Sequence, residues 1–258
     1  MTRASHAIAA ALFIGSAAVT ITWCGSMAQM AGMDMPGGWT MSMAWMRMAD
    51  QSWLDAAAAF LGMWTVMMVA MMMPSLAPIL WRLRRNLAAS QVPGTGWLTA
   101  LAGAAYFCVW SVAGLLVYPF GVALAQVTML DTAIARAVPL AVGVVVLLAG
   151  LLQFTHWKAR HLVCCRSSAL HRSGVSDDAI AVFRYGVSLA LHCLLCCVGL
   201  MAILLVVDVM DLSVMVAVTI AITVERLMPA PGRVARALGL VIAAAGVLLI
   251  GQAILGMG

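Results

Sequence analysis

Apolar residues along the chain fall into seven long stretches, separated by shorter polar connections. The stretches span roughly 7–24, 56–81, 97–121, 136–157, 180–206, 212–228 and 237–256. A helix needs about 20 apolar residues to cross the hydrocarbon core of a bilayer, which is about 30 Å thick. The sixth stretch is short and needs tilt or local thinning of the bilayer. The pattern therefore predicts an all-α protein, a polytopic transmembrane bundle of about seven helices.

Lysine and arginine residues are distributed unevenly between the connections. With the N-terminus in the cytoplasm, only Arg47 and Arg136 fall on the outer side. The other twelve fall on the inner side: Arg3, Arg82, Arg84, Arg85, Lys158, Arg160, Arg166, Arg172, Arg184, Arg226, Arg233 and Arg236. Cytoplasmic connections carry the excess of basic residues in membrane proteins, so the N-terminus is predicted to be cytoplasmic. The first stretch can also be interpreted as a signal peptide, whose removal would leave the remaining topology unchanged.

The composition supports the membrane class and excludes several functions. Only 9% of the residues are charged and 65% are hydrophobic, whereas about 25% are charged in a typical soluble domain. The net charge of +5 follows from the basic inner connections, so it does not indicate nucleic acid binding. The sequence contains no P-loop, no phosphorylation-type aspartate motif and no catalytic triad. Neither ATP use nor enzyme activity is therefore predicted.

The connection between the first two stretches is rich in methionine. It reads "GSMAQMAGMDMPGGWTMSMAWMRMADQSW", and we predict an extracytoplasmic loop with one short interfacial helix. Thioether sulfur is a soft, neutral ligand that selects Cu(I), although a methionine-rich segment lying on lipid is the alternative. The methionines are Met27, Met30, Met33, Met35, Met41, Met43, Met46 and Met48. We divide the chain into residues 1–54, an anchor helix with this loop, and residues 55–258, a six-helix metal-binding domain.

A second group of methionines lies inside the second apolar stretch, in "MWTVMMVAMMMPS" at residues 63–75. On a helix, residues three and four apart share a face. Met63, Met67 and Met71 therefore form one column, Met68 and Met72 form the adjoining column, and Met73 points away. Methionine also fills gaps in ordinary cores and contacts lipid, so packing remains the alternative to metal binding. Our candidate metal ligands from this stretch are Met67, Met68, Met71 and Met72.

A matching stripe of sulfur occurs in the fifth stretch, in "LHCLLCCVGLM". Cys193, Cys196, Cys197 and Met201 share one helical face and extend over about 12 Å. Thiolates and thioethers together are the ligand set that Cu(I) prefers. Zinc would also bind thiolates in principle. The many thioethers and the lack of hard oxygen donors favour copper instead, in the Cu(I) state. Small apolar cysteines packing inside a bundle are the alternative.

The only glutamate, Glu225, lies in the apolar sixth stretch. A carboxylate in such surroundings faces protein or water and is a functional hypothesis by default. We predict that Glu225 neutralises a bound cation and count it among the metal ligands. An ion pair with Arg226 or Arg184 is the alternative.

Two further groups of polar residues occur at the ends of the apolar stretches. On the inner side, His156, His161, Cys164 and Cys165 fall within ten residues, and His161 and Cys165 share a helical face. This group is either a delivery site for a soft metal or a solvated basic loop. On the outer side, Asp208 and Asp211 are predicted to cap the sixth helix.

These motifs together resemble a bacterial family described as predicted metal-binding integral membrane proteins, whose members include copper-resistance and copper-chaperone-like proteins. The resemblance rests on the methionine motif, the cysteine motif "CLLCCVGLM" and the stretch "ERLMPAPG". The matching residues are Met63, Trp64, Met67, Met68, Met71, Met72, Pro74, Ser75, Cys193, Cys196, Cys197, Met201, Glu225, Arg226, Pro229 and Gly232. The likeness spans roughly 56–250 and implies copper handling in the bacterial inner membrane.

The sequence departs from the family pattern at a few positions. Leu195 and Val198 stand where the family has glycine and tryptophan around the cysteine pair. In the inner connection, Lys158, Cys165 and Arg166 match, whereas His161 replaces the first cysteine. Asp211 replaces a turn asparagine. The histidine substitution still provides a ligand for a soft or borderline metal.

The sequence therefore predicts an integral membrane copper-binding protein. It would capture Cu(I) on the outer methionine loop, hold it between the second and fifth helices, and deliver it to a copper-dependent enzyme or serve as an accessory subunit of that enzyme. One alternative is a membrane thiol oxidoreductase that uses Cys193, Cys196 and Cys197. Another is a structural bundle subunit, in which small residues such as Gly239, Ala243 and Gly246 pack the last helix.

Overall fold

The computed structural model describes residues 2–29, 32–47, 51–167 and 178–257. Its helices are α1 (Thr2–Gln29), α2 (Trp53–Ala89), α3 (Thr95–Leu130), α4 (Thr132–Leu152), α5 (His156–Ser167), α6 (Ala179–Val207), α7 (Leu212–Leu227) and α8 (Pro231–Met257). A two-stranded hairpin, β1 (Met33–Met35) and β2 (Trp39–Met41), and a short 3-10 helix, η1 (Met43–Trp45), lie between α1 and α2. The all-α class is confirmed, with this small hairpin as an addition.

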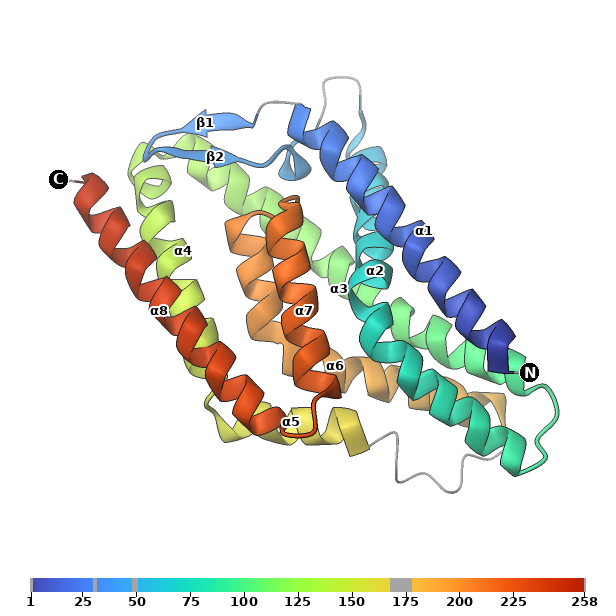
Figure 1. Cartoon of the computed structure of the whole chain (residues 1–258). Coiled ribbons are helices and arrows are strands. Elements are labelled where there is room, and N and C mark those ends of the chain that lie inside the picture. Colours follow the sequence, from blue (N-terminus) through green and yellow to red (C-terminus); the bar gives the residue numbers. More distant parts are fainter. Residues whose placement is uncertain (1, 30–31, 48–50, 168–177, 258) are drawn as a thin grey trace.

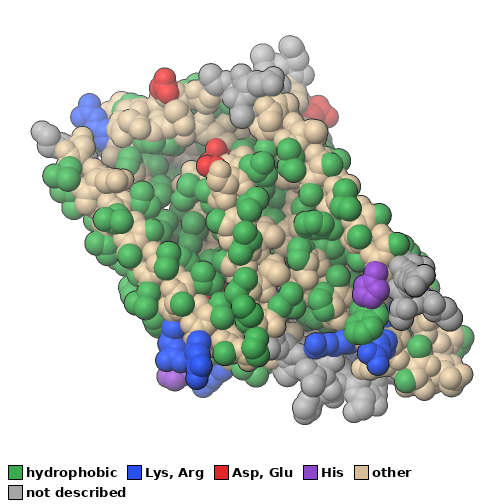
Figure 2. All heavy atoms as spheres, viewed as in Figure 1, with side chains coloured by type: hydrophobic (Ala, Val, Ile, Leu, Met, Phe, Trp, Pro, Cys, Tyr) green, Lys and Arg blue, Asp and Glu red, His purple; other side chains and the backbone are tan. Residues whose placement is uncertain are grey.

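The long helices run back and forth between the two ends of a bundle (Figure 1). The N-terminus, the α2–α3 connection, α5 and the α7–α8 connection lie at one end, which we call the basic end. The hairpin, the α3–α4 and α6–α7 turns and the C-terminus lie at the other, the hairpin end. Figure 2 shows a broad hydrophobic surface between them, with most of the visible Lys and Arg at the basic end. Successive connections therefore alternate between the two ends, as the distribution of basic residues predicts. Arg172 lies outside the described residues.

All seven predicted stretches form helices, but several bounds differ: α2 and α3 extend beyond the predicted 56–81 and 97–121, to Trp53–Ala89 and Thr95–Leu130. The stretch predicted at 136–157 ends at Leu152 and is followed by a turn and then by α5. The helix α7 has 16 residues and would span about 24 Å, less than the core of a bilayer. Within the described residues, six helices are long and apolar enough to cross a membrane.

Capping by aspartate explains where several helices begin. The Asp131 carboxylate accepts hydrogen bonds from the backbone N–H groups of Ala133 and Ile134 at the start of α4. Asp211 does the same for Ser213 and Val214 at the start of α7. These bonds satisfy N–H groups that have no partner within the helix. The predicted capping role is confirmed for Asp211, whereas Asp208 accepts a hydrogen bond from the backbone N–H of Met210 in the preceding turn and does not cap the helix.

The methionine-rich connection, predicted as a loop with one short helix, contains a β-hairpin at residues 33–41, followed by the short helix η1. Gly37 and Gly38 have φ angles of +105° and +73°, a region that glycine adopts without a steric penalty, and they form the turn. The indole N–H of Trp39 donates to the carbonyl oxygen of Ala135 at 2.8 Å. The hairpin is thereby fixed to the start of α4. Met30 and Met48 lie outside the described residues.

The last helix packs tightly against α4 through small residues. A Cβ atom on Gly150 would lie 2.5 Å from the backbone nitrogen of Ala243, and one on Gly246 would lie 2.5 Å from that of Leu147. Larger side chains at these positions would force the helices apart. The packing role expected for Gly239, Ala243 and Gly246 is present in the structure. It holds α4 and α8 together at one side of the bundle (Figure 1).

Candidate metal centre

The three cysteines of α6 face the interior of the bundle. Cys193, Cys196 and Cys197 are 0%, 1% and 1% exposed. Their spacing of three and four residues puts them on one face, and α6 turns that face toward α2, α5 and α7. The Sγ atoms of Cys196 and Cys197 are 3.5 Å apart, and those of Cys193 and Cys197 are 3.9 Å apart. The sequence-based prediction of an inward stripe is consistent with this geometry.

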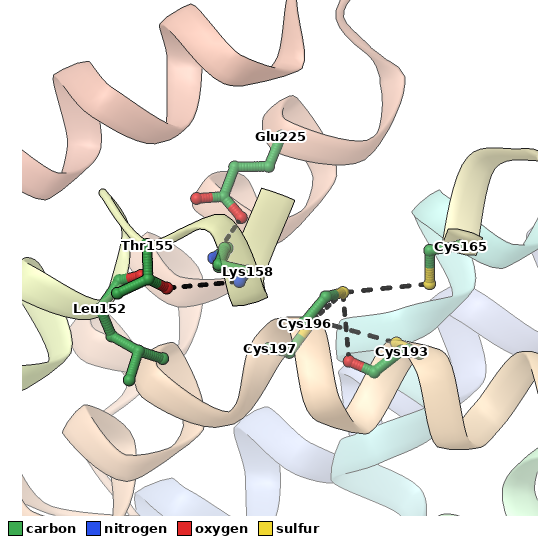
Figure 3. Close-up of polar contacts among 8 residues, drawn as sticks. All are labelled: Leu152, Thr155, Lys158, Cys165, Cys193, Cys196, Cys197 and Glu225. Carbon is green, nitrogen blue, oxygen red and sulfur yellow. Dashed lines mark hydrogen bonds and ion pairs between the residues drawn. The ribbon is translucent and has the colours of Figure 1, made fainter. Parts of the chain in front are cut away.

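A fourth thiol reaches the same place from α5. The Sγ atom of Cys165 lies 3.9 Å from that of Cys196, and Cys165 is fully buried. Figure 3 shows it pointing toward the α6 cysteines from the facing helix. We call Cys165, Cys193, Cys196 and Cys197 the thiol centre. Our candidate ligand set omitted Cys165, although its helical spacing from His161 and its match to the family motif had already marked it.

The spacing of these sulfur atoms fits a metal ion. The ligand atoms of Cys165, Cys193 and Cys196 all lie within 4.8 Å of one another. A metal–thiolate bond of about 2.3 Å, as in zinc sites, allows two sulfurs on one ion to be at most about 4.6 Å apart. Small movements of the side chains would therefore suffice for all three thiols to bind one ion.

Two polar side chains from other helices donate hydrogen bonds to the thiol centre. The Tyr106 hydroxyl of α3 donates to Cys193 Sγ at 3.0 Å. The Arg226 guanidinium of α7 lies 3.2 Å from Cys193 Sγ and 3.6 Å from Cys165 Sγ, and it also donates to Ser75 Oγ at 2.8 Å. Such donors stabilise negative charge on sulfur. Sequence reasoning had counted Arg226 as a basic residue of the inner connections, yet it is only 5% exposed.

The methionines of α2 at positions 67, 68, 71 and 72 are buried inside the bundle. Within the described part of the chain, Met72 is the one for which a contact with a thiol is found. Met72 Sδ lies 4.0 Å from Cys193 Sγ. Met67, Met68 and Met71 are at most 3% exposed, and Met201 on α6 is 6% exposed. Met73, expected to point away, is buried as well. A ligand role for Met67, Met68, Met71 and Met201 therefore stays a prediction.

Glu225 forms a buried ion pair, but not with the partners considered in the sequence analysis. Its Oε2 atom lies 2.8 Å from Lys158 Nζ, and the two residues are 1% and 2% exposed. Figure 3 shows the carboxylate turned toward Lys158 on α5. The partner is thus neither Arg226 nor Arg184. A ligand role for Glu225 stays a prediction, and the pair fixes α5, which carries Cys165, against α7.

The thiol centre thus joins four helices by soft and charged contacts. The thiols come from α5 and α6, the thioether from α2 and the guanidinium from α7. Sulfur donors of both kinds in a buried site suit a soft monovalent ion such as Cu(I). Within the described residues, the methionines of the hairpin, Met33, Met35 and Met41, lie at the opposite end of the bundle.

Comparison with known proteins agrees with this chemistry. No curated protein and no solved structure matches the chain. Residues 61–249 match a protein family, PpoB2, described as copper chaperone. The match includes α2 from its third turn, α3 to α7 and most of α8, and therefore every residue of the thiol centre. Because the match covers well over half of the sequence, the chain belongs to the PpoB2 copper chaperone family.

Proposed function

We propose that this protein is a membrane-embedded Cu(I) chaperone that holds its cargo at the thiol centre. The observation that carries the proposal is the convergence of Cys165, Cys193 and Cys196 from two helices, with Met72 Sδ beside them. Thiolate and thioether ligands select Cu(I) over hard ions. The Arg226 guanidinium balances the negative charge of a copper–thiolate complex, which would otherwise be costly in a buried site.

The remaining parts of the proposal are the location of the carrier and the route of its cargo. The chain would lie in the bacterial inner membrane as a multi-pass protein with its N-terminus in the cytoplasm. Copper would be captured on the outer methionine-rich segment and held between α2 and α6. From there it would pass to a copper-dependent enzyme or another membrane subunit. The buried thioethers of Met67, Met68 and Met71 and of Met201 offer soft ligands along the interior.

A thiol oxidoreductase explains the site less well. Reactive thiols are usually accessible thiolates, whereas the four thiols of the thiol centre are at most 1% exposed. A carrier does not need accessible thiols in the same way, because its thiols only share an ion.

Elemental analysis of the purified chain tests the proposal. The protein is kept reduced, loaded with Cu(I) and washed with a moderately strong Cu(I) chelator, so that only tightly held copper remains. We expect nearly stoichiometric copper in the wild type and almost none after Cys165→Ser, Cys193→Ser and Cys196→Ser are combined. Cys108→Ser is the matched control, because Cys108 is exposed on α3. Undiminished copper in the triple variant would refute the proposal.

A further inference from the structure

A second group of sulfur side chains surrounds a cavity at the hairpin end of the bundle. The cavity has a volume of about 510 Å³ and lies between the end of α1, the segment from β2 to η1 and the α6–α7 turn. Its lining includes Cys24, Met27, Met41, Met43 and Met210. We call it the hairpin pocket. Cys24, Met27 and Met43 lie outside the region that matches the copper chaperone family.

The sulfur donors of the hairpin pocket are held by ordered structure. Cys24 and Met27 are three residues apart on α1 and therefore share a face. Met43 is the first residue of η1. The ring of Trp45, also in η1, packs on the Phe60 ring of α2, with 5.3 Å between the ring centroids. The backbone N–H of Met210 donates to the Asp208 carboxylate at 2.9 Å. Donors from three separate parts of the chain are thus fixed around one cavity.

The charges of the hairpin pocket favour a cation. Asp208 and Asp211 both line it, and no Lys or Arg is among its described lining residues. Each carboxylate already accepts backbone hydrogen bonds through Oδ1. Ca²⁺ requires six to eight oxygen ligands, more than two engaged carboxylates provide. The thiol and thioethers instead suit a soft ion, which the carboxylates would attract without binding it.

We propose that the hairpin pocket is a second Cu(I) site, at which Cys24, Met27, Met43 and Met210 receive copper before it reaches the thiol centre. The inference rests on the proposed function, since the ion is the same cargo. Cys197 and Asp208, which follows the last residue of α6, are eleven positions apart; this separation corresponds to about 16 Å along a helix, so one ion cannot contact both sites. Met201, buried on α6, lies between them in the sequence.

Cu(I) titration against a weak chromogenic chelator, on the full-length chain in detergent under reducing conditions, tests the inference. The pocket variant combines Cys24→Ser, Met43→Leu and Met210→Leu. We expect it to bind one Cu(I) ion fewer than the wild type while keeping the tightly held ion of the thiol centre. Retention of that inner ion also shows that the variant is folded. A pocket variant that binds as many ions as the wild type, with unchanged affinities, would overturn the inference.

A matched control has the same number of sulfur atoms removed elsewhere. Cys108→Ser, Met129→Leu and Met228→Leu change one exposed thiol and two exposed thioethers that neither line the pocket nor belong to the methionine-rich segment. We expect this control to bind as many ions as the wild type. The triple serine variant of the thiol centre should lose only the inner ion. If it kept both ions, the proposed function would fail while the hairpin pocket remained supported.

A second measurement does not depend on the pocket variant being stable. In the triple serine variant of the thiol centre, alkylation of Cys24 by a small maleimide is followed by mass spectrometry with and without Ag(I), a redox-inert probe for Cu(I). We expect Ag(I) to slow the modification of Cys24 strongly and that of Cys108 only slightly. Equal rates at Cys24 with and without Ag(I) would overturn the inference.

Discussion

The thiol centre and the hairpin pocket are both rich in sulfur, but their surroundings differ. The thiol centre has four buried thiols, one neighbouring thioether and the guanidinium of Arg226. The hairpin pocket has a single thiol, four methionines and two carboxylates around a cavity. One site is therefore rich in ligands that become anionic and is balanced by a cation. The other is rich in neutral ligands and has anions at its edge.

This difference suggests a division of labour between the two ends of the bundle. Neutral thioethers bind Cu(I) without releasing protons, which suits capture and exchange, whereas thiolates bind it more strongly. Carboxylates near the hairpin pocket would attract a cation, and the buried thiols would retain it. Four substitutions test whether this comparison holds, and they are described from the largest expected effect to the smallest.

The largest effect is expected from Glu225→Gln at the basic end, because it leaves Lys158 buried without its partner. Removing one partner of a buried ion pair typically costs about 3–5 kcal/mol. The free energy of unfolding, measured by denaturant titration, should fall accordingly. Combining Glu225→Gln with Lys158→Met should recover much of the loss. If the double variant is stable and keeps its tightly held copper, Glu225 is not a ligand, contrary to the prediction from the sequence.

The next effect is expected from Arg226→Met. Hydrogen bonds to charged groups contribute about 1.5–3 kcal/mol, so losing the guanidinium should weaken Cu(I) binding at the thiol centre about ten- to a hundredfold. Competition with a chelator of known affinity measures this change. Arg233→Met is the control, because Arg233 is exposed on α8. Unchanged binding would show that Arg226 does not support the ion, and tighter binding would show that it competes with it.

A smaller effect is expected from Asp211→Ala at the hairpin end. Loss of the helix cap should reduce the free energy of unfolding by about 1 kcal/mol. Asp131→Ala removes an equivalent cap from α4, away from the hairpin pocket, and should cost a similar amount. Only Asp211→Ala should weaken binding of Cu(I) at the hairpin pocket. Equal affinities in the two variants would argue against an electrostatic role for Asp211.

The smallest effect is expected from Met72→Leu, a swap of similar volume that should cost less than about 1.5 kcal/mol of stability. It removes the thioether 4.0 Å from Cys193 Sγ. We expect Cu(I) affinity at the thiol centre to fall less than about tenfold, which corresponds to under 1.4 kcal/mol. Met73→Leu, at the neighbouring buried position, should leave the affinity unchanged. Identical behaviour of the two variants would remove Met72 from the ligand set.

Features with a local pattern could be predicted from the sequence. The seven apolar stretches all became helices, because apolar length is a property of each segment by itself. The inward stripe of Cys193, Cys196 and Cys197 followed from helical spacing in the same way. The end of α4 at Leu152 was missed, because the apolar pattern was extended through Phe154 and Trp157 across the polar residues Gln153, Thr155 and His156.

Partners from distant segments were decided only by the tertiary structure. The sequence determined that α6 carries three thiols on one face, that α2 carries thioethers and that a carboxylate lies in an apolar segment. It did not determine that Cys165 and Arg226 meet those thiols, or that Lys158 is the partner of Glu225. Helical periodicity specifies the face on which a side chain lies, whereas its neighbour depends on how the helices pack against one another. The thiol centre and the hairpin pocket exist only because α1, α5 and α7 pack where they do around α2 and α6.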